Sequence, residues 1–217
     1  MRFLITAGPT REPIDPVRYL SNRSSGKMGY AIAEAAIEAG HEVTLISGPV
    51  SVERPPGSAV VPISTSDEMF AAVRQHSSRC DVLVMCAAVA DYKPAKFSKS
   101  KIKKRGENIS LDLVPTRDIL KSLPTDRQYL VVGFAAETEN VAANALKKLQ
   151  EKNCDIVVAN DVSRADSGME SDANEVTILF REGEKKTISH APKKIVAREL
   201  IKIFENVCEK RLTKKIA

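Results

Sequence analysis

The sequence predicts an α/β protein with a Rossmann-like, doubly wound and mostly parallel sheet, an inserted arm, and a C-terminal β-hairpin plus helix. Short apolar runs alternate along the chain with segments of helical periodicity. The runs are apolar throughout, which is typical of strands covered on both faces. The chain has 217 residues, of which 43% are hydrophobic, and this is enough for one domain with a sizeable core.

The individual elements follow from local signals. The first predicted helix, for example, carries its apolar side chains on one stripe and is followed by Gly40 as a stop signal. Gly8-Pro9 and Gly48-Pro49 mark the ends of the first two strands. The predicted strands are 2–6, 42–46, 81–86, 129–133 and 155–159. The predicted helices among them are 27–39, 66 to about 75, and 140–152.

Two later segments depart from this alternation. Residues 91–113 are polar and lysine-rich, with a strand expected only at 109–113, and are too long for a plain strand–helix connection. They predict an arm with few apolar anchors, mobile without a ligand. Residues 175–189 predict a β-hairpin, and a last helix from about 192 to 207 completes a single domain over 1–209. The basic residues 210–217 are expected to form a disordered tail.

Charge and composition exclude several classes of function. The net charge is +5, but two clusters of four basic residues each, within 101–105 and 210–217, account for much of it. This argues against nucleic-acid binding. The chain shows no signal peptide and no run long enough to span a bilayer, so we expect a cytoplasmic protein with no membrane partner. Four cysteines without C-x-x-C spacing predict reduced thiols, and the sequence identifies no metal ligands.

A polar run, SNRSSGKMG at 21–29, lies between the first strand and the helix that follows it. Helix N-terminal N–H groups meet anions at such a junction, and glycines allow close approach of the backbone. The run predicts a site for a phosphorylated or carboxylate substrate. The candidate substrate-binding residues in it are Asn22, Ser24, Ser25, Gly26 and Lys27.

Two familiar nucleotide motifs do not fit this run. A P-loop would need glycine at Ser21 and a hydroxyl residue at Met28. A dinucleotide site would need a G-x-G-x-x-G run, but Gly8 stands alone and the second strand ends without an acidic residue. A nicotinamide-dependent reductase is therefore a less favoured alternative.

Further candidates follow two later strands. Ala87 and Ala88 would let a ligand lie against the backbone, and Asp91 emerges at the sheet edge where such folds bind ligands, although it could equally cap a turn. Phe134 suits a stacked base but could be plain core. Lys101, Lys103 and Lys104 of the arm could close on a polyphosphate or form a solvated charge run. Lys148 and Lys152 share a helix face, where lysines are usually only solvated.

Six stretches together resemble the phosphopantothenate–cysteine ligase family of coenzyme A biosynthesis, also called phosphopantothenoylcysteine synthetase. They are ITAGPTREPIDPVRYLSNRSSGKMG, EVTLISGPV, CAAVADY, KIKK, VVGFAAET and ANDVS, in this order between positions 4 and 163. In many bacterial members this domain follows a flavin-dependent decarboxylase. This chain begins at the first strand of the ligase and resembles a stand-alone ligase or an excised domain.

The resemblance implies a two-step ligation. A nucleoside triphosphate activates the carboxylate of 4′-phosphopantothenate, and the amine of L-cysteine then attacks the acyl nucleotidylate. The nucleotide is CTP in most bacterial members and ATP in eukaryotic ones, and the basic motif 101–104 favours CTP here. The resemblance also implies Mg²⁺ with CTP as co-substrate, no flavin or nicotinamide, and a homodimer. The exposed arm and hairpin strands give the homodimer some support of their own.

The resemblance implies roles for single residues. Asn22 matches the residue associated with the acyl-nucleotidylate intermediate, and Lys101 matches a triphosphate lysine, so both are candidate catalytic residues. The remaining nucleotide-binding candidates are Asp91, Lys103, Lys104, Thr116, Arg117, Asp118, Ile119, Phe134, Lys148 and Lys152. The run 116–119 departs from the bacterial Asn-Pro-Asp-Ile at its first two positions. An inactive nucleotide- or phosphopantothenate-binding regulator on the same fold is the alternative that an intact Asn22 and Lys101 argue against.

Overall fold

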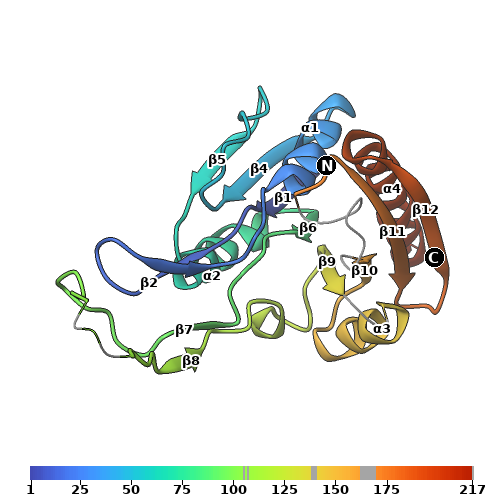
Figure 1. Cartoon of the computed structure of the whole chain (residues 1–217). Helices are drawn as coiled ribbons and strands as arrows, with labels where there is room; N and C mark the ends of the chain where they lie inside the picture. The colour runs from blue at the N-terminus through green and yellow to red at the C-terminus, as the bar shows by residue number, and fades with distance from the viewer. Residues whose placement is uncertain (105, 107, 138–140, 162–169, 217) are drawn as a thin grey trace.

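The computed structural model describes residues 1–104, 106, 108–137, 141–161 and 170–216 (Figure 1). Thr138, Val162 and Ser163, which belong to the stretches that carry the family resemblance, lie outside the described residues. No helix in the described part of the chain is both long and apolar enough to cross a bilayer.

An eight-stranded sheet forms the centre of the molecule, in the order β12-β11-β10-β9-β6-β1-β4-β5. The six strands from β10 to β5 run parallel, and β11 and β12 add an antiparallel hairpin at one edge. The fold class predicted from the sequence is therefore confirmed. The strands are β1 (Arg2–Ala7), β4 (Glu42–Ser47), β5 (Ala59–Pro62), β6 (Val82–Met85), β9 (Leu130–Glu137), β10 (Ile156–Asp161), β11 (Ala173–Phe180) and β12 (Lys185–Pro192).

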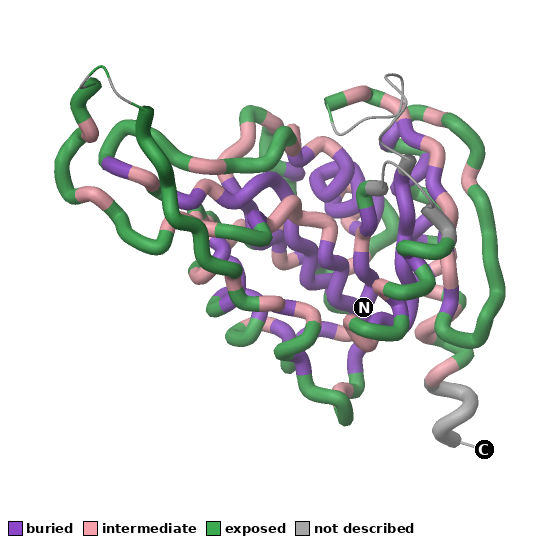
Figure 2. The backbone as a smooth tube through the Cα atoms, turned by 60° about the horizontal axis from the view of Figure 1, so that its bottom comes forward, coloured by how far each residue is buried: buried purple, intermediate pink, exposed green. Residues whose placement is uncertain are grey.

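Helices cover both faces of the sheet. The helices are α1 (Lys27–Glu38), α2 (Ser66–His76), α3 (Val141–Glu151) and α4 (Lys193–Ile216). Phe3 and Ile5 of β1 pack into the core under α1 and α4, while Leu4 between them packs into a second core under α2 and α3. Because successive strand residues face opposite sides, burial on both sides requires the continuous apolar runs seen in the sequence. Figure 2 shows the buried residues gathered in the middle of the molecule and the exposed residues along its outer segments.

Two small antiparallel sheets project to one side of the main sheet (Figure 1). One pairs β2 (Arg11–Pro13) with β3 (Tyr19–Ser21), and the other pairs β7 (Tyr92–Pro94) with β8 (Leu113–Pro115). The sequence analysis missed all four strands because three residues are too few for a periodic signal. The strand expected at 109–113 is wrong: only Leu113 is paired, and the arm is the long excursion between β7 and β8.

The C-terminal segment also differs from expectation. Residues 210–216, predicted as part of a disordered tail, continue α4 to Ile216. No glycine or proline interrupts the helix there, and the guanidinium of Arg211 lies 2.5 Å from the carboxylate of Asp155, just before β10. This ion pair fastens the end of α4 to the sheet. Two short 3-10 turns, η1 (Ser77–Arg79) and η2 (Leu120–Ser122), and the edge strand β5 were likewise not predicted.

Candidate active site

The loops that follow β1 and β6 lie against each other at the carboxyl edge of the sheet. The amide of Ala88 donates to the carbonyl of Gly8 at 2.9 Å, and the amide of Thr10 donates back to Ala88 at 3.2 Å. The hydroxyl of Thr10 also accepts from the amide of Ala90 at 3.0 Å. Because parallel strands end at the same edge, these contacts bring the two loops predicted to bind ligands into one surface.

Asn22 links these loops through its side chain. Its amide nitrogen donates to the carbonyls of Ala88 at 3.1 Å and Val89 at 3.2 Å. Sequence reasoning expected this amide to donate to the ligand, but in this structure both N–H groups are directed at backbone carbonyls. Asn22 therefore holds the loop after β6 in place and presents an exposed amide at the same edge.

The N-terminus of α1 lies beside Asn22. Gly26 is its N-cap with a φ of 79°, and no side chain caps the first turn. This positive φ favours glycine, and a Cβ at Gly26 would lie 2.6 Å from Val50 Cγ1. Ser24 and Ser25 are half-buried next to this turn, so backbone N–H donors and hydroxyls lie close together where the sequence predicts an anion site. Lys27 turns toward the segment before β11, where its Nζ lies 2.6 Å from Asp172.

A pocket of about 230 Å³ opens where β6 and β9 end. Its walls include nine of the residues that the sequence or the resemblance singled out as site candidates. They are Ala87, Asp91, Thr116, Arg117, Asp118, Ile119, Phe134, Lys148 and Lys152. The structure thus brings together residues spread over about 65 positions of sequence, and Phe134 is half-buried in the wall rather than part of the closed core.

Lys148 of α3 and Lys152, just after this helix, are not simply solvated. Lys148 Nζ donates to the carbonyl of Phe134 at 2.5 Å, and Lys152 Nζ pairs with the carboxylate of Asp118. Burial raises the pKa of Asp118, but the hydrogen bond from Lys152 and the amide of Lys121 outweigh it and hold that pKa below its ordinary value. The pocket wall is therefore charged and already ordered.

The run 116–119 is anchored on both sides. Thr116 donates through its hydroxyl to the carbonyl of Ala90 at 2.6 Å. Arg117, at a position where the chain departs from the bacterial pattern, pairs with Asp67 at 2.9 Å and stacks over Phe70 at 4.3 Å. Asp67 also pairs with Lys93 of β7, and the hydrogen bonds from Lys93 and Arg117 lower its pKa. One carboxylate at the start of α2 thus binds both β7 and the run that follows β8, at the base of the arm.

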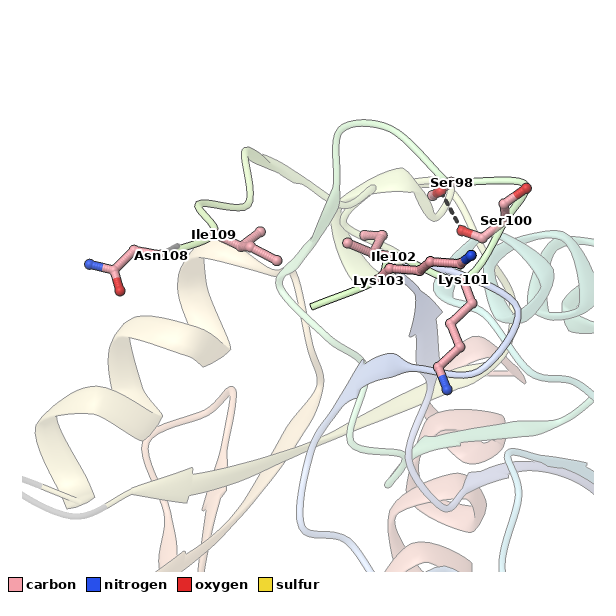
Figure 3. Close-up of a pocket in the computed structure, with 7 residues that line it drawn as sticks. All are labelled: Ser98, Ser100, Lys101, Ile102, Lys103, Asn108 and Ile109. Atoms are coloured by element: carbon pink, nitrogen blue, oxygen red, sulfur yellow. Dashed lines mark hydrogen bonds between the residues drawn. The ribbon is translucent and has the colours of Figure 1, made fainter. Parts of the chain in front are cut away.

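The basic motif of the arm forms a separate pocket of about 480 Å³, lined by Lys101 and Lys103 among other residues (Figure 3). Figure 3 shows these two lysines extending from the arm in different directions. Lys101, Lys103 and Lys104 are all exposed, and none of them lines the pocket at the ends of β6 and β9. The structure therefore does not bring the arm lysines into contact with the other nucleotide candidates.

The turn between β2 and β3 clamps the arm next to Lys101. The amide of Ile102 donates to the carboxylate of Asp15 at 3.1 Å, and Arg18 donates to the carbonyl of Ile102 at 2.8 Å. The side chain of Asp15 is fully buried and lies 2.5 Å from the guanidinium of Arg18. The Arg18 hydrogen bond, with the Ile102, Val17 and Arg18 amides, holds the pKa of Asp15 well below its usual range. Sequence reasoning missed this clamp, although the Asp15-Pro16 pair is a turn signal.

The described residues contain no group of three or more His, Cys, Asp or Glu side chains that could hold a metal ion. The four cysteines are free, and burial raises the pKa of Cys80 to about 12 and that of Cys154 to about 11. These thiols stay protonated at neutral pH and act as core side chains, in agreement with the sequence analysis.

A doubly wound sheet with a charged pocket at its carboxyl edge is typical of α/β domains whose ligand-binding sites lie at that edge. The sequence profile of the family described as "DNA/pantothenate metabolism flavoprotein C-terminal domain" (DFP) matches residues 1–207, and the chain belongs to this family. The resemblance found in the sequence is therefore confirmed.

Curated relatives agree with the family match. The coenzyme A biosynthesis bifunctional protein CoaBC of Bacillus subtilis (strain 168) is 45% identical over 200 residues, covering 91% of this chain and 49% of the relative. The CoaBC protein of Escherichia coli (strain K12) is 46% identical over 190 residues, covering 85% and 47%. The chain thus spans about half the length of the curated relatives that it matches.

Solved structures match over nearly the whole chain. The crystal structure of the C-terminal domain of CoaBC has a TM-score of 0.82 and 44% identity, and the match covers 96% of each chain. A mutant of Cab2, in a structure described as a complex with phosphopantothenate-cysteine, has a TM-score of 0.80 at 17% identity, covering 100% of this chain and 89% of that one. The second likeness concerns the fold alone.

Proposed function

We propose that the chain joins 4′-phosphopantothenate to L-cysteine in coenzyme A biosynthesis, with CTP as the activating nucleotide. The observation that carries the proposal is the gathering of nine candidate residues around one pocket, in a chain that matches the C-terminal domain of CoaBC over 96% of its length. The relatives' names place them in coenzyme A biosynthesis and call them bifunctional, and this chain matches about half of their length.

The reaction has two steps. The carboxylate of 4′-phosphopantothenate attacks the α-phosphorus of CTP, the bond to the β-phosphate oxygen breaks, and pyrophosphate leaves. The amine of cysteine then attacks the acyl carbon, CMP leaves with the electron pair of the acyl–oxygen bond, and the nitrogen loses a proton to solvent. Both steps concentrate negative charge on phosphate oxygens, so they need fixed donors and cations.

The described residues offer those groups in two places. The uncapped first turn of α1 and the hydroxyls of Ser24 and Ser25 suit an anionic group of the substrate, and Asn22 holds the adjoining loop. The pocket wall with Phe134, Lys148 and Lys152 suits a base and its ribose phosphate. Lys101, Lys103 and Lys104 on the arm are free of ion pairs among the described residues and suit the β- and γ-phosphates.

Mg²⁺ belongs to this proposal as a partner of the triphosphate. Mg²⁺ commonly binds through one or two carboxylates together with substrate phosphates and water, so a dedicated cluster is not required. Asp91 is a pocket carboxylate that forms no ion pair with a described residue, and it is the residue that would hold the ion. The ion would neutralise charge that develops on the phosphates.

The decisive experiment incubates the protein with 4′-phosphopantothenate, cysteine and each of the four ribonucleoside triphosphates, and measures pyrophosphate and the amide product. We expect product with CTP well above that with ATP, because buried groups that hydrogen-bond a cytosine edge are left unpaired by another base. Equal or better turnover with ATP contradicts the CTP assignment. Binding without any pyrophosphate release favours the regulatory alternative, and oxidation of a nicotinamide cofactor favours the reductase.

We also propose that the protein is a homodimer. Large apolar side chains are exposed together on the projecting hairpins and the arm, among them Tyr19 at 48%, Tyr92 at 56% and Phe97 at 53%. An exposed apolar surface of this kind marks an interaction site. Sedimentation at micromolar concentration should give twice the chain mass of 23.7 kDa. Tyr92→Glu should shift the protein toward the monomer, and a wild-type protein that sediments as a monomer contradicts the proposal.

A further inference from the structure

A further pocket of about 530 Å³ lies at the opposite edge of the sheet from the candidate active site. Its walls include Asp81, Tyr129 and Asp155, which directly precede β6, β9 and β10, so it lies at the amino ends of these strands. Leu130 lines this pocket and Phe134 lines the other, and the four residue steps between them along β9 span about 13 Å. The proposed ligation does not use this second pocket.

Three arginines surround one buried carboxylate in this pocket. Asp155, whose side chain is 4% exposed, lies 3.2 Å from Arg127, 3.7 Å from Arg181 and 2.5 Å from Arg211. The amide of Val131 donates to the same carboxylate at 2.8 Å. One negative charge therefore faces three positive charges. The other acidic residue of the wall, Asp81, is paired with Arg2 at 2.7 Å and does not offset the excess.

Arg127 keeps hydrogen-bonding capacity for a ligand, whereas Nε and one terminal nitrogen of Arg181 already donate to Cys154 and Asn153. A guanidinium has five N–H donors in a planar fork that matches carboxylate and phosphate oxygens. The side chain of Arg127 is 5% exposed, and its Nε is buried with no hydrogen-bond partner in the described part of the chain. Buried donors of this kind normally have an acceptor, and an oxygen of a bound anion would supply one.

Part of the remaining wall is apolar, beside the polar side chains of Thr125, Gln128 and Tyr129. Met1, Leu130 and Cys208 contribute to it, and burial raises the pKa of the Cys208 thiol to about 11, so this side chain stays neutral. A wholly inorganic anion would leave that wall without a partner. The combination of a basic end and an apolar wall is typical of sites for small organic molecules with one anionic group.

We propose that this basal arginine pocket, defined by Arg127, Arg181 and Arg211 with the wall at Leu130, binds a small organic anion. A carboxylate or phosphate group lies against the three guanidinium groups, and the apolar part lies against Leu130 and Cys208. The competing interpretation is an ion cluster that only fastens α4 and the β11–β12 turn to the sheet. Under that interpretation the cluster would stabilise the fold and have no affinity for anions.

The test titrates phenyl phosphate, benzoate and phenol into the whole chain and follows ¹³C-labelled leucine methyl groups by NMR. Leu130 reports on the basal arginine pocket and Leu120 on the candidate active site, because each lines only one of them. We expect a saturable shift of Leu130 with at least one of the two anions and none with phenol at the same concentrations. A Leu130 response to phenol as strong as to the anions overturns the proposal.

Variants separate anion binding from a structural cluster. Arg211→Gln and Arg181→Gln should each weaken binding at Leu130 about tenfold, as expected for the loss of a charge-assisted hydrogen bond. Arg198→Gln is the matched control, since Arg198 lies on the same helix and pairs with Glu38 away from the pocket. If Arg211→Gln fails to fold, the affinity is measured with Arg181→Gln alone, because the Arg181 side chain is 49% exposed and its replacement disturbs the fold less. No saturable shift of Leu130, or unchanged affinity in the folded variants, shows a structural cluster only.

Discussion

The pocket at the ends of β6 and β9 and the arm are ordered by different means. Four of the pocket's charged side chains are already paired with the protein: Lys152 with Asp118, Lys148 with the carbonyl of Phe134, and Arg117 with Asp67. The lysines of the basic motif are exposed, and the β2–β3 turn holds the arm by its backbone, at Ser98 through Ile14 and at Ile102 through Asp15 and Arg18. The pocket is therefore a preformed surface, whereas the lysines of the basic motif form no ion pair with the described residues.

This difference suggests a division of labour within the proposed reaction. A preformed wall discriminates between ligands, because its groups cannot rearrange to suit a wrong one. Exposed lysines tolerate movement and supply charge to phosphates wherever these lie. Changes in the pocket should therefore affect both stability and ligand choice, whereas changes in the arm should affect activity alone. The following predictions test this contrast.

The largest effect is expected for Asn22→Asp, at the junction of the two loops. A carboxylate would face the carbonyls of Ala88 and Val89 that now accept from the amide, and would repel the anionic intermediate. We expect the complete reaction to fall by a factor of about 10² to 10³, as for the loss of one preorganised group. Product formation measures this, with circular dichroism as the control for folding. Near-normal turnover in a folded variant would show that Asn22 does not contact the intermediate.

Lys101→Gln should lower pyrophosphate release by about tenfold or more, because a charged donor to phosphate is lost. Its melting temperature should stay within about 1 °C of wild type, since an exposed lysine contributes little to folding. Lys99→Gln, an exposed lysine two residues earlier on the arm, is the matched control and should change neither quantity. If Lys101→Gln releases pyrophosphate at the wild-type rate, or melts many degrees lower, the arm has a structural role and not the proposed role in activation.

Lys152→Gln should behave in the opposite way to a change on the arm. It leaves the carboxylate of Asp118 without its partner, so we expect stability to fall by about 1 kcal/mol, which is about 3 °C for a domain of this size. Nucleotide affinity should fall as well. Lys147→Gln, whose lysine pairs with Glu151 on the exposed side of α3, is the control. Equal melting points for Lys152→Gln and Lys147→Gln would contradict the preformed wall.

The smallest effect concerns the pH dependence of the clamp. The pKa of Asp15 is depressed in the folded protein, so its contribution to stability is present above its unfolded pKa of about 4 and is lost as the pH falls toward its folded pKa. Asp15→Asn should therefore lose stability near pH 7 and show a shallower decline between about pH 5 and pH 2. Thermal melts across this range measure both, with Asp126→Asn, an exposed loop residue, as the control. Parallel pH profiles for wild type and Asp15→Asn would rule out the clamp.

The main sheet and its helices were predictable because their signals are local. Burial on both faces of β1 requires Phe3, Leu4 and Ile5 to be apolar in succession, and one-sided packing of α1 gives its stripe. The short strands β2, β3, β7 and β8 have no comparable period. Each of these strands is defined by its pairing with another short strand. Because β7 and β8 are about twenty residues apart in the sequence, no local pattern predicts their pairing.

The site was predictable in part. The sequence identified Asn22 and the run around Gly26 directly, since helix N-terminal donors and glycine are local features. The run 116–119, Lys148 and Lys152 were assigned to the nucleotide site only through the family resemblance. That Lys148 and Lys152 reach toward Phe134 and Asp118 depends on how α3 packs beside β9, which no local pattern specifies.

The sequence by itself determined the fold class, most of the long elements and the chemical character of the loops at the carboxyl edge. Hydrophobic periodicity and turn residues are signals that extend over only a few positions of sequence. The fold class and the long elements could be predicted because they depend on such local signals. Tertiary structure alone decided that Asp15 holds the arm 87 residues later, that Arg117 pairs with Asp67, and that three arginines from distant segments meet at Asp155. Such contacts join residues far apart in the chain, so only the packed fold defines their geometry.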